Sequence, residues 1–209
     1  MAAGPLHDRQ YRAAAAAIDG ACTGDRDRDE DEDIAMTTAP KRDAQRVDST
    51  GKHLGRRIAG VEIARVVPVE DDRGELCELW TEARDTVGLP VRHSYMVTMQ
   101  PGKARGWVMH ELQTDRVYVL RGRVRMGLYD DRPDSPTRGA LQVECISERN
   151  RASVTIPPGV WHGFQNIGSD EAWFVNFTTH AYDYEHPDKF RLPLVNDLIP
   201  FAFDDPAGW

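Results

Sequence analysis

Two histidines are the residues best suited to chemistry at neutral pH. His162 follows a Pro-Pro-Gly turn at residues 157–159, which redirects the chain into a short apolar run. His110 ends another apolar run, at residues 105–110. Because imidazole titrates near neutral pH, either ring could act as a general base, and Asp115 or Asp197 could orient it.

The cysteines and the overall charge exclude several classes of protein. Cys22, Cys77 and Cys145 lack the spacing of metal ligands, and an odd number suits a reducing compartment better than a disulfide scaffold. The net charge of -8 argues against nucleic-acid binding, which requires a basic surface. No apolar run approaches the roughly 18 residues of a membrane span, and the N-terminus lacks a signal peptide. The sequence therefore predicts a cytoplasmic protein that binds neither nucleic acid nor membrane.

Composition divides the chain into an extension, one folded domain and a short tail. Residues 1–54 contain an alanine run and the charged stretch 25–33 (DRDRDEDED), which has nothing to bury. We expect these residues to be disordered. A folded domain is expected over residues 55–203, followed by a tail at 204–209.

Short apolar runs rich in β-branched and aromatic residues occupy the predicted domain and are separated by Gly, Pro, Asn and Asp. Arg121-Gly122 fits a tight hairpin, and only residues 82–88 suggest a short helix. This pattern indicates an all-β antiparallel sandwich or barrel. The predicted strands are 61–67, 75–80, 93–99, 105–110, 116–120, 123–129, 140–146, 153–156, 160–165 and 172–178.

Four segments carry a resemblance to known proteins. Residues 157–166 (PPGVWHGFQN) fit the second cupin motif, PxGxxHxxxN. In order along the chain, 72–78 (DRGELCE), 105–106 (RG), 131–137 (DRPDSPT) and 156–164 resemble motifs of the dTDP-4-dehydrorhamnose 3,5-epimerase family. The resemblance implies a cupin-type jelly-roll β-barrel and a homodimer that exchanges strands. It further implies an isomerase that epimerises C3, C5 or both on a dTDP-linked 4-keto-6-deoxysugar, without a cofactor.

The same resemblance assigns substrate contacts to Arg73, Glu78, Arg105 and His162, with Arg132 as a further contact. Guanidinium groups suit such a role because their paired donors match the oxygens of a pyrophosphate.

Both proton-transfer positions of the resembled family are altered. The histidine that serves the family as base corresponds to Val108, and the tyrosine that serves as acid corresponds to Asn176, a substrate contact here. Neither replacement can transfer a proton. Because side chains alternate along a strand, His110 faces the same way as Val108 and is the predicted displaced base, together with His162. Candidate replacement acids are Tyr118, Tyr182 and Tyr184.

Two other functions are kept open. His110, Asp115 and His162 fall on ligand positions of the cupin metal motifs, so they could hold a divalent metal, with Gln113 as a weak further ligand. Val108 leaves that ligand set one histidine short. The alternatives to the epimerase are a non-catalytic cupin that binds a small molecule, and a metal-dependent cupin enzyme on a non-sugar substrate.

Overall fold

The computed structural model describes residues 42, 45, 47–49, 55 and 57–205. Contacts between Cα atoms divide the chain into two units, residues 1–44 and 45–209, and the fold described below belongs to the second. The predicted disordered extension lies almost wholly outside the described residues. Within the described part of the chain, no helix is long and apolar enough to span a membrane.

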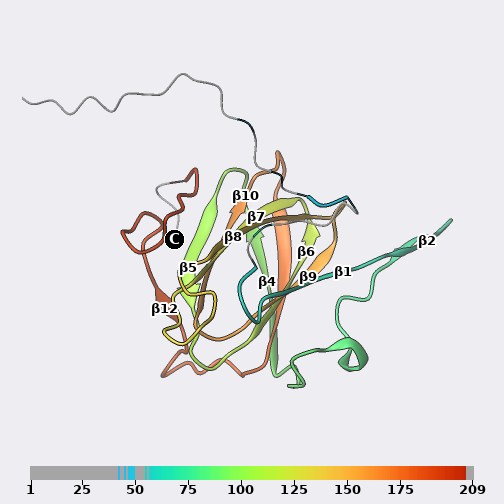
Figure 1. The fold of residues 1–209 in the computed structure, drawn as a ribbon. Coiled ribbons are helices and arrows are strands. Elements are labelled where there is room, and N and C mark those ends of the chain that lie inside the picture. The colour runs from blue at the N-terminus through green and yellow to red at the C-terminus, as the bar shows by residue number, and fades with distance from the viewer. Residues whose placement is uncertain (1–41, 43–44, 46, 50–54, 56, 206–209) are drawn as a thin grey trace, which may run out of the picture. The chain divides into compact units, whose positions relative to one another are not determined.

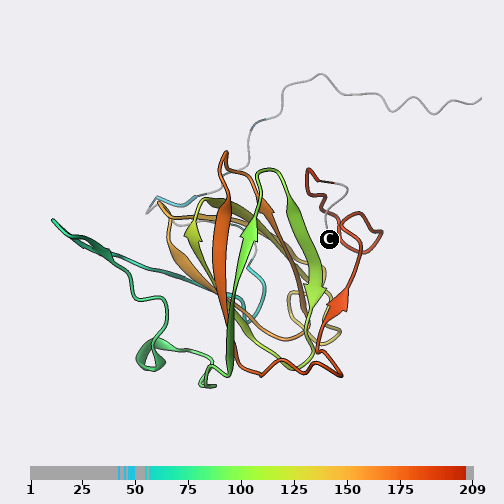
Figure 2. The ribbon, with the colours of Figure 1, turned by 180° about the vertical axis from the view of Figure 1, so that it is seen from behind.

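Two five-stranded antiparallel sheets face each other, as Figures 1 and 2 show from opposite sides. In spatial order, the first sheet contains β1 (Glu62–Arg65), β9 (Ala152–Ile156), β6 (Asp115–Arg121), β11 (Ala172–Thr178) and β4 (His93–Met99). The second contains β12 (Phe190–Arg191), β5 (Ala104–Met109), β10 (Val160–Asn166), β7 (Arg123–Asp130) and β8 (Leu141–Ser147).

A separate hairpin lies between β1 and β4 in the chain and extends away from both sheets (Figures 1 and 2). It pairs β2 (Val69–Asp71) with β3 (Gly74–Leu76), and all of its strand residues are exposed. A single 3₁₀ turn, η1 (Glu82–Arg84), follows it.

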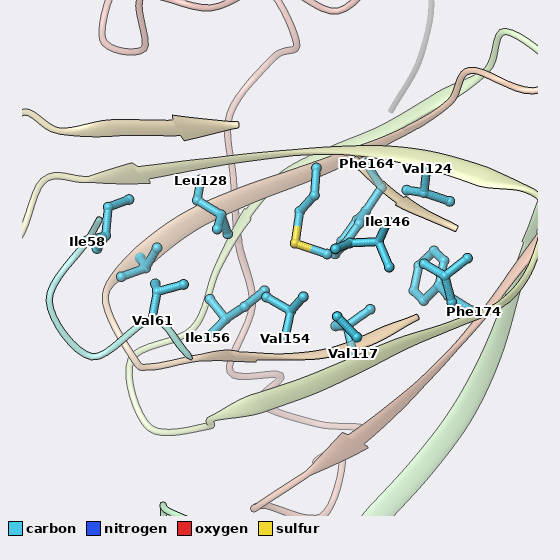
Figure 3. Packing of buried hydrophobic residues seen from close by; sticks show 14 of the residues in the cluster. Ile58, Val61, Val117, Val124, Leu128, Ile146, Val154, Ile156, Phe164 and Phe174 are labelled. Carbon is cyan, nitrogen blue, oxygen red and sulfur yellow. The ribbon is translucent and has the colours of Figure 1, made fainter. Parts of the chain in front are cut away.

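The core lies between the two sheets, where alternate residues of facing strands are buried. Val117 and Val154 of the first sheet meet Leu128 and Phe164 of the second (Figure 3). Because the side chains of a strand alternate between its two faces, one face of each sheet supplies this apolar layer.

A second apolar cluster covers the outer face of the second sheet. Trp107 is fully buried there, against Leu194 and Phe203 of the C-terminal segment. Its Nε1 donates a hydrogen bond to the carbonyl of Leu194, at 3.3 Å. The chain after β12 therefore packs back across the barrel. Ordered packing continues past the predicted boundary at residue 203, because Asp205 is buried and accepts a hydrogen bond from the amide of Ala104.

The prediction of an all-β jelly-roll barrel is confirmed, and its predicted strands are observed with small changes at their ends. Two local predictions were wrong. The strand expected at 75–80 ends at Leu76, and the helix expected at 82–88 is only the 3₁₀ turn η1. The Arg121-Gly122 hairpin is present. Gly122 has a φ of 82°, and a Cβ there would lie 2.9 Å from Ala172.

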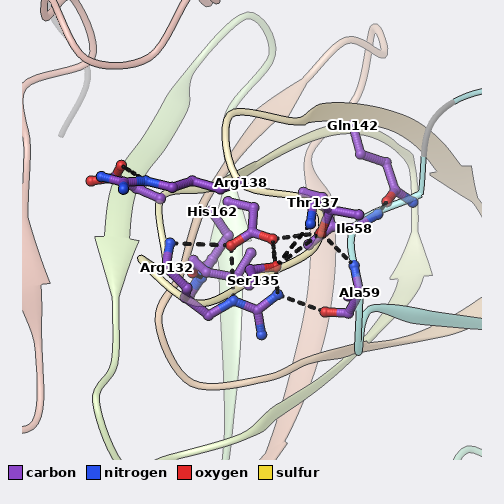
Figure 4. A network of polar contacts seen from close by, with 11 residues as sticks. Ile58, Ala59, Arg132, Ser135, Thr137, Arg138, Gln142 and His162 are labelled. Atoms are coloured by element: carbon purple, nitrogen blue, oxygen red, sulfur yellow. Dashed lines mark hydrogen bonds and ion pairs between the residues drawn. The ribbon is translucent and has the colours of Figure 1, made fainter.

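The segment 131–137 closes the turn between β7 and β8 around Asp130, whose carboxylate is fully buried. This carboxylate accepts hydrogen bonds from Nε of Arg132 at 2.8 Å and from the hydroxyl of Thr137 at 2.6 Å. Figure 4 shows Arg132, Ser135 and Thr137 of this network beside Ala59. Arg132 and Thr137 also bind the backbone of Ala59. The network therefore fastens the chain before β1 to this end of the barrel.

Candidate active site

A central cavity opens between the two sheets. The first sheet contributes Tyr95 from β4, Asp115 from β6 and Asn176 from β11. The second contributes Arg105 and Val108 from β5 and His162 from β10, and His110 follows β5 directly. Lys189 and Arg191 of the C-terminal segment complete the polar lining. Residues of both sheets and of the C-terminal segment therefore meet in one cavity.

A close approach of β5 and β10 shapes one wall of this cavity. Gly106 has a φ of 132°, and a Cβ at this position would lie 2.6 Å from the Cα of Gly163. Any other residue would therefore push the two strands apart. Val108 pairs with His162 in the register of β5 and β10. The glycine of the Arg105-Gly106 motif thus permits the packing that places the neighbouring residues in the cavity.

Three buried side chains form the centre of the cavity. Nε2 of His162 lies 3.3 Å from Oδ2 of Asp115, and Nε2 of His110 lies 3.5 Å from the same oxygen. The two imidazole rings are 5.5 Å apart. As predicted from strand alternation, His110 and Val108 line the same cavity. Asp115 is the carboxylate that contacts both rings.

The hydrogen bonds of the two rings fix which nitrogen faces the cavity. Nδ1 of His162 lies 3.1 Å from the carbonyl of Val160, and Nδ1 of His110 contacts the carbonyl of Asp188. A carbonyl only accepts, so Nδ1 of His110 carries a proton and its Nε2 faces Asp115. Both nitrogens of His162 face acceptors, namely the carbonyl of Val160 and the carboxylate of Asp115. The other oxygen of Asp115 accepts a hydrogen bond from Gln113, at 2.6 Å.

Burial and charge set opposite protonation states in this cluster. Burial lowers the pKa of His110 below its ordinary value, although the negative charge of Asp115 opposes the change. Burial would raise the pKa of Asp115, but its contacts with His162 and His110 outweigh burial and hold that pKa below its ordinary value. At neutral pH, Asp115 is therefore ionised and His110 is predominantly neutral, as a general base must be.

Asn176 holds a tyrosine of the neighbouring strand in place. Its Nδ2 donates a hydrogen bond to the hydroxyl of Tyr95 at 2.9 Å, and its Oδ1 accepts one from the amide of Arg116 at 3.0 Å. Asn176 and Tyr95 are direct partners in the pairing of β11 with β4. Burial, with the charge of Asp115, raises the pKa of Tyr95 to about 12, so its hydroxyl stays protonated.

The C-terminal segment is fastened to the cavity by Asp188. Its carboxylate accepts hydrogen bonds of 2.8–2.9 Å from the amides of Glu111, Leu112 and Gln113. The next residue, Lys189, is exposed as a whole, but part of its side chain lines the cavity. Burial lowers the pKa of Lys189, and the nearby positive charge of Arg191 adds to the effect.

Sequence reasoning missed both Tyr95 and Lys189. Tyr95 carries no motif, and its place follows only from the pairing of β4 with β11. The single available signal was alternation, because Tyr95 and Val97 are two residues apart and both line the cavity. Lys189 lies 79 positions after His110 in the chain, in a segment whose path depends on the Asp188 contacts.

Several predicted site residues lie elsewhere in the protomer. Asp197 is exposed and outside the cavity lining, so Asp115 takes the orienting position that both were candidates for. Arg132 is engaged by Asp130 rather than by the cavity, because its guanidinium completes the β7–β8 turn. Neither residue therefore lines the central cavity of its own protomer.

Arg73 and Glu78 also lie outside the cavity of their own protomer. The side chain of Arg73 is 85% exposed at the turn of the β2–β3 hairpin, where it pairs with Asp71. Glu78 pairs with Arg84 near η1.

None of the three tyrosines proposed as acids lines the central cavity. The hydroxyl of Tyr118 lies 2.7 Å from the sulfur of Cys77. Tyr182 and Tyr184 line a neighbouring pocket instead. The structure therefore offers Tyr95 as the tyrosine of this site.

The predicted metal ligands do come together. One ligand atom each of His110, Asp115 and His162 lies within 4.8 Å of the others, in a fully buried group. Two imidazoles and a carboxylate form a donor set that zinc or iron accepts. Val108 supplies no ligand at the position of the missing motif histidine. Whether a metal binds here stays a prediction.

Comparisons with known proteins agree with the fold and the cavity. The family model described as dTDP-4-dehydrorhamnose 3,5-epimerase matches residues 56–194. The probable low-salt glycan biosynthesis epimerase Agl13 of Haloferax volcanii is 39% identical over 137 residues, covering 65% of this chain and 88% of the relative. The spore coat polysaccharide biosynthesis protein SpsL of Bacillus subtilis is 33% identical over 150 residues, covering 70% and 97%.

A comparison with solved structures supports the same family at the level of the fold. The dTDP sugar isomerase of Desulfovibrio desulfuricans superimposes with a TM-score of 0.64 at 25% identity, covering 70% of this chain and 92% of that one. The family match spans both sheets and every residue of the central cavity. This chain belongs to the dTDP-4-dehydrorhamnose 3,5-epimerase family.

Proposed function

We propose that this epimerase-family enzyme acts on a nucleotide-linked 4-keto-6-deoxysugar and inverts C3, C5 or both by removing the proton next to the ketone. The observation that carries the proposal is the buried His110–Asp115–His162 cluster in a cavity that Arg105, Lys189 and Arg191 also line. Removal of a proton next to a ketone needs an unprotonated base, and the resulting enolate needs nearby positive charge.

His110 is the proposed base. Its Nε2 carries the free electron pair because Nδ1 is held by the carbonyl of Asp188. On taking the proton, the ring becomes an imidazolium 3.5 Å from the ionised Asp115, which stabilises the new charge. His162 contacts the same carboxylate and is the proposed second group for proton exchange.

The cationic residues of the cavity are assigned to two negatively charged groups of the substrate, the enolate oxygen and the pyrophosphate. Lys189 lines the cavity and is electrostatically coupled to Asp115, so it is placed to stabilise the enolate oxygen that forms on C4. Arg105 and Arg191 offer paired donors for the pyrophosphate. The ketone itself accepts the electron pair of the broken C–H bond, so the proposed reaction requires no cofactor.

The two alternatives to an epimerase, a non-catalytic binding cupin and a metal-dependent cupin enzyme, receive less support. A non-catalytic cupin would not need a neutral buried imidazole beside an ionised carboxylate. A metal-dependent enzyme on a non-sugar substrate is not favoured, because the family is one of sugar epimerases and Agl13 is itself named an epimerase.

A homodimer is part of the proposal. The β2–β3 hairpin extends away from both sheets and exposes Val69 and Leu76, which a lone protomer would leave in water (Figure 1). Both residues line a groove with Trp80 and Arg116, whose Nε1 and Nη1 are buried without an acceptor among the described residues. A strand of a second copy would supply both the apolar cover and the acceptors.

In such a dimer, Arg73 and Glu78 would reach the substrate of the partner protomer. The cytoplasmic location predicted from the sequence stays a prediction.

The test is deuterium incorporation from heavy water into dTDP-4-keto-6-deoxyglucose, followed by NMR. We expect exchange at C3 or C5 with the wild-type enzyme and a loss of about 100-fold or more in His110→Asn. The control is His186→Asn, which removes an exposed imidazole outside the central cavity. No exchange with the wild-type enzyme, despite measurable binding of the sugar nucleotide, would overturn the proposal.

A further inference from the structure

The hydrogen bond between Asn176 and Tyr95 places a phenol in the cavity, next to the position where the family carries its own tyrosine. The two residues are direct cross-strand partners, and Nδ2 of Asn176 lies 2.9 Å from the hydroxyl of Tyr95. The hydroxyl missing from position 176 is therefore replaced by one from the neighbouring strand.

The direction of this hydrogen bond leaves the phenol proton available. Oδ1 of Asn176 is occupied by the amide of Arg116, so the side-chain amide is oriented and Nδ2 must be the group that faces Tyr95. The oxygen of Tyr95 accepts this bond, and among the described residues no acceptor is recorded for its own O–H. Since Tyr95 lines the central cavity, the O–H can be donated to a bound substrate.

The two sheets place this phenol and the proposed base on different walls. Tyr95 and Asn176 belong to β4 and β11 of the first sheet, whereas His162 belongs to β10 of the second and His110 follows β5 of the second. Epimerisation removes a proton from one face of the sugar carbon and returns one to the other. A base and an acid on different walls meet that requirement.

Other groups fit the role of acid less well. Tyr95 is the one tyrosine among the residues that line the cavity. Tyr118 is engaged by Cys77, and Tyr182 and Tyr184 line the neighbouring pocket. Lys189 is already assigned to the enolate oxygen, where it must keep its positive charge.

We infer that Tyr95 is the general acid of this enzyme and that Asn176 is its positioning residue. The inference rests on the proposed function. The C–H bond breaks with its proton passing to Nε2 of His110, and the electron pair moves into the enolate. The O–H of Tyr95 then breaks, its proton forms the new C–H bond on the other face, and the ketone is restored. The phenolate regains a proton from water, His110 releases one to water, and Nδ2 of Asn176 stabilises the phenolate by its hydrogen bond.

The decisive variant is Tyr95→Phe, assayed in heavy water for exchange and for inversion separately. We expect deuterium to keep entering the recovered substrate with its configuration retained, because His110 still removes and returns a proton on its own face. Formation of the epimer should fall by about 100-fold or more. Tyr129→Phe, in the apolar cluster on the outer face of the second sheet, is the matched control and should leave both rates unchanged.

The positioning role of Asn176 has its own readout. Asn176 also hydrogen-bonds Asp115, so Asn176→Ala should lower exchange somewhat and inversion much more. The ratio of inversion to exchange in the double variant should match that of Tyr95→Phe alone. A merely structural role would lower exchange and inversion together. The variant Tyr95→Phe with Asn176→Tyr returns the phenol to the family position and should recover part of the inversion.

The outcomes separate this inference from the function on which it rests. If the wild-type enzyme neither exchanges nor inverts, the proposed function fails. If the wild-type enzyme inverts the sugar and Tyr95→Phe inverts it equally well, the proposed function stands and Tyr95 is not the acid. Equal loss of exchange and inversion in a folded Tyr95→Phe protein would also overturn the inference, because it would assign the residue to binding or proton removal.

Discussion

The main-chain carbonyl of Asp188 accepts a hydrogen bond from Nδ1 of His110, while the carboxylate of the same residue binds the amides of residues 111–113. One residue of the C-terminal segment thus sets the tautomer of the proposed base and closes the turn beside it. It also fixes the path of the segment that brings Lys189 to the cavity.

Asp188→Ala should therefore lower turnover about tenfold or more and destabilise the fold by about 1–3 kcal/mol, because three amides lose a charged acceptor. Turnover and thermal unfolding measured on the same samples would check both effects. Asp183→Ala is the control, since Asp183 binds the amides of Glu185 and His186 in the same segment without contacting His110. Equal effects of the two changes would remove the special role of Asp188.

The pH dependence of kcat/KM should report the proposed base. Burial lowers the pKa of His110, so the imidazole stays neutral to a pH below its ordinary value and activity should fall only at more acid pH. Asp115→Asn removes a negative charge that raises this pKa. The acid limb should therefore move to lower pH, with turnover reduced about 100-fold because the imidazolium loses its counterion. An acid limb that moves to higher pH would contradict the assignment of Asp115.

Arg105→Ala should weaken binding of dTDP about tenfold, because a bidentate contact to the pyrophosphate is lost. Titration calorimetry gives the affinity directly. Arg138→Ala is the control, since this exposed guanidinium pairs with Asp131 outside the cavity. Arg73→Ala should also weaken binding if the β2–β3 hairpin serves the partner protomer. Unchanged affinity in both Arg73→Ala and Arg105→Ala would overturn the nucleotide-binding part of the proposal.

Removal of metal should leave the activity unchanged. The proposed reaction uses the ketone as its electron acceptor, so treatment with a chelator should not alter the rate of exchange or inversion. Elemental analysis of the purified protein, with the assay repeated after dialysis against EDTA, tests this. A stoichiometric metal whose removal abolishes turnover would show that His110, Asp115 and His162 act as ligands.

Asp130→Asn should destabilise the barrel by about 2–4 kcal/mol, since the fully buried carboxylate accepts bonds from Arg132, Ser135 and Thr137. Burial opposes ionisation, but these bonds hold its pKa below the ordinary value. The stabilisation is therefore present above the unfolded pKa and is lost as the pH falls through the folded pKa. Urea unfolding at several pH values would measure it. Asp134→Asn, exposed in the same turn, should have no effect.

The sequence by itself determined the fold class and half of the candidate site. Alternating apolar runs specify strands because the side-chain period of a strand is two, and turn residues mark where each strand ends. The same alternation placed His110 on the face of Val108, and the motifs placed His162 and Arg105. These residues lie in or directly beside regular strands, so local spacing was enough to group them.

Only the tertiary structure decided which groups from distant segments complete the site. The hydroxyl of Tyr95 reaches Asn176 because β4 and β11 pair in one particular register, and strand register is a long-range property. Lys189 enters the cavity because Asp188 binds the loop after β5. The sequence suggested that Arg132 and Asp197 belong to the site. In the structure, Arg132 contacts the buried carboxylate of Asp130, and Asp197 is exposed to solvent. A motif specifies residue types and local spacing, whereas the contacts of each side chain depend on how the strands pair and where the chain between them runs.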